Sequence, residues 1–84
     1  MNEVLTQVII NTILFLELSD DEIIDQDAAV SQLEQMASIL KQLDEADQKT
    51  FIKLIEKFAD EEDSTDQERI QFLHSIPENL GLRE

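Results

Sequence analysis

EADQKTFIKLIEKFADE, residues 45–61, carries the clearest helical pattern in this chain of 84 residues. Its apolar residues recur at intervals of three and four, which places them on one face of an α-helix and the lysines on the other. The inward residues are Phe51, Ile52, Leu54, Ile55, Phe58 and Ala59, and the outward lysines are Lys49, Lys53 and Lys57. The alternation that predicts a β-strand does not occur over any useful window. This stretch therefore predicts an all-α fold.

Three further stretches, residues 3–18, 28–43 and 66–75, also have helical spacing. The chain contains one Gly and one Pro, both near its end, so nothing before them interrupts a helix. The links between the four helices are short, which predicts that sequential helices are antiparallel neighbours. We expect one domain, residues 1–84, folded as a compact four-helix bundle or an orthogonal helical array with no sheet.

Short polar side chains mark where the helices begin. The expected N-caps, in chain order, are Asn2, then Asp25 or Asp27, then Asp44 with Asp47 three residues later, and finally Thr65 paired with Glu68. Pro77 is expected to stop the last helix, with at most one more turn after it. Gly81 is expected to adopt the left-handed conformation, which lets Leu80 and Leu82 fold back onto the helices.

The first helix is apolar on two sides, so its inward face is the hardest to assign. The predicted core comprises Leu5, Val8, Ile9, Leu16, Val30, Leu33, Met36, Leu40, Leu54, Ile55, Phe58, Leu73 and Ile76. A second stripe, Ile10–Leu14–Leu18, lies outside this set and has the spacing of one helix face. It must be covered by the C-terminal tail, by a second copy of the chain, or by a partner.

Composition restricts the environment of the protein. Hydrophobic residues make up 42% of the chain, which is enough for a core, and there is no cysteine. The lack of cysteine excludes disulfides, thiolate zinc sites and a cysteine nucleophile, and it favours a reducing, cytoplasmic location. The N-terminus lacks the pattern of a signal peptide, and the apolar residues 4–18 are too few and too polar to span a bilayer.

The formal net charge is −14, and it is unevenly distributed. Residues 1–40 contain eight acidic residues and no lysine or arginine. Such a field repels nucleic acid and anionic membranes and attracts a basic protein surface. The expected partner is therefore a basic protein, with no direct binding of nucleic acid or membrane.

Motifs for catalysis, cofactors or metals are not recognisable. His74 is the only histidine, and residues 60–71 lack both the glycine and the final glutamate of a calcium loop. Length, charge and helix count resemble acyl carrier proteins, but the second helix lacks the Asp-Ser-Leu motif, and Ser31 falls within that helix. The many carboxylates lie in solvated runs rather than in a predicted cleft. We expect no enzyme activity, no cofactor and no metal.

Two acidic runs at the helix connections are the predicted partner-binding surface, because carboxylates there project freely. The predicted contact residues are Asp20, Asp21, Glu22, Ile23, Ile24 and Asp25 in the first run and Glu61, Glu62, Asp63 and Asp66 in the second. Ile23 and Ile24, or the Ile10–Leu14–Leu18 stripe, are the expected apolar centre of the contact, since rim charges contribute little affinity.

Three segments resemble small acidic immunity proteins of bacterial toxin–immunity pairs, including those of contact-dependent inhibition systems. They are Leu16-Glu17-Leu18, the linker of residues 19–25, and residues 54–62. The resemblance implies an immunity or inhibitor protein that neutralises a basic cognate toxin, such as a nuclease, by covering its functional surface. Two alternatives remain open. One is a DNA-mimic inhibitor of another nucleic-acid-binding protein, and the other is a helical module that forms a homodimer through the first helix.

Overall fold

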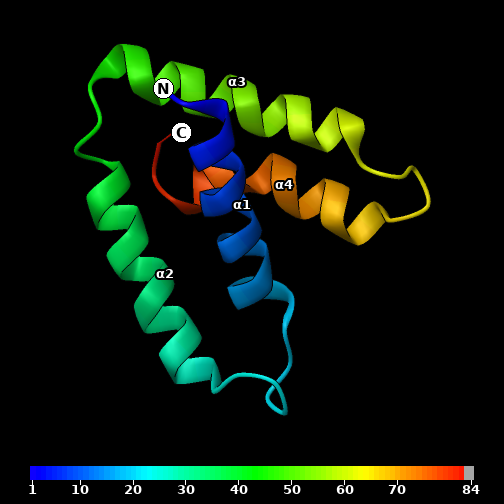
Figure 1. Ribbon diagram of the computed structural model, residues 1–84. Helices are drawn as coiled ribbons and strands as arrows, with labels where there is room; N and C mark the ends of the chain where they lie inside the picture. The colour runs from blue at the N-terminus through cyan, green and yellow to red at the C-terminus, as the bar shows by residue number, and fades with distance from the viewer. Residues whose placement is uncertain (83–84) are drawn as a thin grey trace.

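Two helical hairpins cross each other in the computed structural model, which describes residues 1–82 (Figure 1). The helices are α1 (Glu3–Leu18), α2 (Gln26–Leu40), α3 (Glu45–Glu61) and α4 (Gln67–Asn79), and the described residues contain no strand. Helices α3 and α4 lie side by side and antiparallel, α1 crosses them steeply, and α2 runs back along α1. The all-α prediction is confirmed, and the arrangement is the orthogonal one.

Side-chain caps set the helix starts, and only the cap of α4 differs from the prediction. The Asn2 side chain accepts a hydrogen bond from the Leu5 amide at 3.1 Å, and Asp44 accepts one from the Asp47 amide at 2.8 Å, as expected. Asp25, rather than Asp27, caps α2 by accepting from the Ala28 amide at 2.9 Å, so α2 begins two residues earlier than predicted. Each cap satisfies an amide that the first helical turn leaves without a partner.

Helix α4 departs furthest from its predicted bounds. Its N-cap is Asp66 rather than Thr65, and it continues through the buried Pro77 to Asn79, so the prediction that the proline stops the helix is wrong. Proline lacks only its own amide hydrogen bond, and the ladder resumes when the Leu80 amide donates to the Ile76 carbonyl at 2.9 Å. The amides of Gly81 and Leu82 then donate to Glu78 and Pro77 in a Schellman motif.

The predicted role of Gly81 is confirmed, because its φ is +75°. This left-handed residue turns the chain back toward the helices. Leu80, just before the turn, is buried in the core, and the turn at Gly81 lets Leu82 pack against that core.

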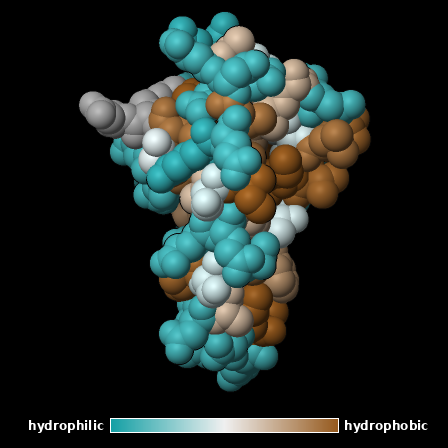
Figure 2. Space-filling model, turned by 90° about the vertical axis from the view of Figure 1, so that its left-hand side faces the viewer, coloured by the Kyte–Doolittle hydropathy of each residue, from teal (hydrophilic) through white to brown (hydrophobic). Residues whose placement is uncertain are grey.

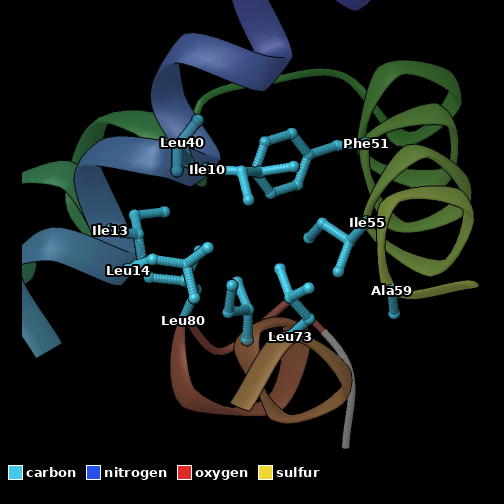
Figure 3. Close-up of a cluster of buried hydrophobic side chains, with 10 residues drawn as sticks. Ile10, Ile13, Leu14, Leu40, Phe51, Ile55, Ala59, Leu73 and Leu80 are labelled. Atoms are coloured by element: carbon cyan, nitrogen blue, oxygen red, sulfur yellow. The ribbon is translucent and has the colours of Figure 1, made fainter. Parts of the chain in front are cut away.

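The core lies where α1 crosses the α3–α4 hairpin, and its side chains converge from all four helices and Leu80 (Figure 3). Its buried members are Ile10, Ile13, Leu14, Leu40, Phe51, Ile55, Ala59, Leu73, Ile76 and Leu80. Phe51 and Ile55 have no exposed surface at all. Helix α2 packs chiefly against α1 and buries only Ala29 and Leu40.

The inward face of α1 is only partly the predicted one, because Leu16 is buried but the rest of the face is rotated around the helix. Ile10 and Leu14, taken from the sequence as a second stripe, are 2% and 3% exposed, whereas Leu5 and Val8, predicted to be core, are 62% and 59% exposed. Thr6 explains how the helix can turn this way, since its hydroxyl donates to the Asn2 carbonyl at 2.8 Å and is therefore buried without an unpaired polar atom. The tail and the other helices cover the Ile10–Leu14 stripe.

The remaining predicted core residues divide into buried and half-buried groups. Leu16, Leu40, Ile55, Leu73 and Ile76 are buried, whereas Ile9, Leu33, Met36, Leu54 and Phe58 are half-buried. Val30 is a further error, because it remains 52% exposed on α2.

Candidate functional site

The structure separates the charges of the two hairpins. In the α3–α4 hairpin, Lys49 pairs with Glu45 at 3.3 Å and Arg69 pairs with Glu62 at 3.0 Å. Lys57 reaches across to Glu3 of α1, and this carboxylate raises the pKa of Lys57 above its ordinary value. No other side-chain ion pair to α1 or α2 is formed by the described residues. The α1–α2 hairpin therefore keeps nearly all of its negative charge uncompensated.

The connection between α1 and α2, residues 19–25, is held in a defined turn. The Asp20 carbonyl accepts from the amides of Ile23 and Ile24, and the Asp20 carboxylate accepts from the Glu22 amide at 3.1 Å. Asp25 is occupied as the cap of α2. All four carboxylates of the turn are exposed, but those of Asp20 and Asp25 accept hydrogen bonds that hold it, which leaves Asp21 and Glu22 as its unengaged charges.

The carboxylates of Asp21 and Glu22 have no hydrogen bond or ion pair with any described residue, and both residues are exposed. They are therefore free to meet a cation from another molecule. We call the set Asp20, Asp21, Glu22, Ile23 and Asp25 the acidic end.

Two apolar side chains are exposed here, Ile23, which follows Glu22 in the turn, and Phe15 of α1. Ile23 is 65% exposed and Phe15 is 52% exposed, and both line one shallow hollow with Leu18. Arg69 also lines the hollow, and its side chain is held by Glu62. Ile24 is half-buried, so the two isoleucines of the turn have different roles. The free carboxylates Asp21 and Glu22 do not line the hollow, but they belong to the same turn as Ile23. Exposed apolar side chains adjoining charged ones have the anatomy of a protein–protein contact.

The second acidic run lies at the tip of the other hairpin, away from the acidic end (Figure 1). Its carboxylates are largely engaged within the chain. Glu62 binds Arg69, Glu61 is 3.9 Å from Lys57, and Asp66 caps α4. The predicted capping box of Thr65 and Glu68 does not form. Instead the Thr65 amide and hydroxyl both donate to Asp63 at 2.9 Å, and these bonds lower the pKa of Asp63.

The outer face of α1 is a second exposed apolar surface. Val4, Leu5, Val8 and Phe15 are between 52% and 69% exposed. Figure 2 shows hydrophobic surface on the right of the molecule. This side faces the viewer in Figure 1, where α1 crosses in front of α4. The Ile10–Leu14–Leu18 stripe cannot serve as the contact centre, because Ile10 and Leu14 are inside the core.

The sequence contains little that would have identified Phe15 as exposed. Because α1 is apolar around most of its circumference, periodicity alone does not tell the inward face from the outward one. The useful signal was Thr6, whose hydroxyl can bond to the backbone four residues earlier and so tolerate burial.

No group of histidine, aspartate and glutamate side chains within residues 1–82 is arranged to hold a metal ion. In the same range, none of the helices has the length and apolar character needed to cross a membrane. His74 is exposed on α4.

Comparison of the chain with protein-family models, with curated proteins and with solved structures finds no match.

Proposed function

We propose that this protein binds a basic protein and neutralises it, as an immunity protein neutralises its cognate toxin, and that the acidic end makes first contact. The observation that carries the proposal is the combination at this end of free carboxylates and exposed apolar side chains. Asp21 and Glu22 have no partner among the described residues, and Ile23, which follows Glu22 in the same turn, is exposed and lines a shallow hollow with Phe15.

Charge and apolar surface have different tasks in such a contact. Complementary fields accelerate association, by up to ~10³-fold when one surface is strongly charged. Affinity comes mainly from a desolvated centre, for which Ile23 and Phe15 are available. A protein that must capture a toxin before it acts benefits from both effects.

Charge also argues against the homodimer as the main state. Two copies would each bring a net charge of −14, and the α1–α2 hairpin contains no lysine or arginine before residue 41. Apposing two such hairpins places like charges together without compensation, which costs free energy at ordinary ionic strength. A basic partner removes that cost.

The proposal is tested by affinity purification from the native host with three baits. They are the wild type, Asp21→Lys/Glu22→Lys at the acidic end, and Asp60→Lys/Glu78→Lys on the α3–α4 hairpin. The two variants change net charge equally, and the control carboxylates are exposed and unpaired within the described residues. We expect one basic protein to be captured by wild type and control and lost from the first variant.

The proposal fails if no basic protein is enriched by the wild type, or if all three baits capture the protein equally. Mixing the captured protein with the wild-type chain should also inhibit the activity of the captured protein. The identity of that activity distinguishes a toxin from another nucleic-acid-binding target.

A further inference from the structure

A groove on another side of α1 lies between α1, α2 and α4, and it has a volume of about 330 Å³. Ile13 and Glu17 of α1 line it, with Val30, Leu33 and Glu34 of α2 and Phe72 of α4. This is near the lower limit of the ~300–1,000 Å³ found for small-molecule sites. The groove therefore suits one or two side chains of a partner better than a large ligand.

The apolar part of the groove comes from α2 residues that the fold does not fully cover. Ala29 is 1% exposed and makes the close contact of α2 with the rest of the molecule, whereas Val30 beside it is 52% exposed. Leu33 is only half-buried. The apolar stripe of α2 is thus wider than the surface it buries against α1, and the remainder faces the groove.

The charged part of the groove consists of two carboxylates, Glu17 on α1 and Glu34 on α2. Glu17 and Glu34 are exposed, and neither side chain has a hydrogen bond or an ion pair with any described residue. Both belong to the hairpin that has no lysine or arginine in its first forty residues. Two like charges lining one concave surface disfavour each other and attract a cation.

We propose that the groove receives a long cationic side chain, lysine or arginine, from a basic partner protein. The methylene stem of that side chain packs over Ile13, Leu33 and Phe72, and its charged group binds Glu17 and Glu34. Lysine and arginine combine an apolar stem with a charged end, which is the pairing that these walls provide. This inference rests on the proposed function for the basic character of the partner, but it assigns a different surface.

Charge complementarity selects this occupant over a second copy of the chain. Another copy carries a net charge of −14, so its approach to the groove is opposed by the same field that attracts a basic protein. A purely apolar segment would leave both carboxylates beside it without a counter-charge.

The test is a titration of the isotope-labelled full chain with a synthetic amphipathic peptide of leucine and lysine, followed by NMR. Two further peptides separate charge from apolar contact: one replaces each lysine with glutamate, and the other replaces each leucine with serine. We expect the leucine–lysine peptide to shift resonances of Val30, Leu33 and Phe72. We also expect nuclear Overhauser contacts between its lysine methylenes and the Ile13 and Leu33 methyl groups.

Matched variants test which carboxylates bind the lysines of the peptide. Glu17→Gln/Glu34→Gln and Asp21→Asn/Glu22→Gln each remove two negative charges from the same hairpin, at the groove and at the acidic end respectively. The groove variant should weaken binding of the peptide roughly 2- to 30-fold, as expected for loss of two exposed ion pairs. The variant at the acidic end should weaken it by less.

The inference is overturned by equal weakening in both variants, since net charge alone would then suffice. It is also overturned if the shifts map to Val4 and Val8 on the outer face of α1, if the leucine–glutamate peptide binds as well, or if no groove resonance moves. Any of these results leaves the proposed function standing, provided that the partner is still captured through the acidic end. If the peptide binds in the groove but no basic protein is captured from the host, the inference about the groove stands and the proposed function fails.

Discussion

The orientation of α1 is tested by two leucines on the same helix. Leu14 is 3% exposed in the core, whereas Leu5 is 62% exposed on the outer face. Replacing Leu14 with alanine deletes fully buried methyl groups and leaves a cavity among Ile10, Leu73 and their neighbours, which costs ~2–5 kcal/mol. That is a large part of the ~4–13 kcal/mol expected for a chain of this size.

The matched change Leu5→Ala removes much less buried surface. About two-fifths of Leu5 is buried. Full burial of a leucine side chain stabilises a protein by ~1.5–3 kcal/mol, so two-fifths of that burial contributes about 1 kcal/mol or less. The higher helix propensity of alanine offsets part of even this loss.

The assay for both variants is thermal unfolding followed by circular dichroism, with urea titration for the free energy. At ~4–8 °C per kcal/mol, Leu14→Ala should lower Tm by about 10 °C or more, and Leu5→Ala by a few degrees at most. Equal losses, or a larger loss for Leu5→Ala, would refute the assignment of the inward face of α1.

Three other predictions concern helix ends and mobility. Asp25→Ala should destabilise the protein by ~1 kcal/mol through loss of the α2 cap, while Asp21→Ala should change the free energy of unfolding in urea very little. Gly81→Ala should cost ~1 kcal/mol because φ is +75° there, and Gly81→Asn should cost less in the same titration, since asparagine tolerates this region better. Amides of α2 should exchange with deuterium faster than those of α3, because α2 buries only Ala29 and Leu40; slower exchange in α2 would contradict this.

The helices themselves were largely predictable from the sequence. The bounds of α1 and α3 agree with the predicted residues 3–18 and 45–61, because Asn2 and Asp44 cap them and apolar spacing runs to their ends. Helix α4 was predicted too short, because Pro77 was given its usual effect although it lies in the last turn, where one missing amide hydrogen bond is tolerated.

The packing of the helices was harder to predict from the sequence than their positions along the chain. The choice between the two faces of α1 depends on which side meets Phe51 and Ile55, and that information lies outside α1. The position of the acidic end could be predicted from the sequence. Which of its carboxylates accept hydrogen bonds within the turn, and which are free, could not. Hydrogen-bond geometry, rather than composition, distinguishes the capping Asp25 from the free Asp21 and Glu22.

The central claim is that the acidic end guides a basic protein onto this chain. Its most direct test is the association rate of the captured partner, measured by stopped flow at low and high salt for the wild type and for Asp21→Lys/Glu22→Lys. We predict a wild-type rate that falls steeply as salt rises, and a variant rate about tenfold lower at low salt that converges with the wild type at high salt. Equal rates for the two proteins, unaffected by salt, would contradict the claim.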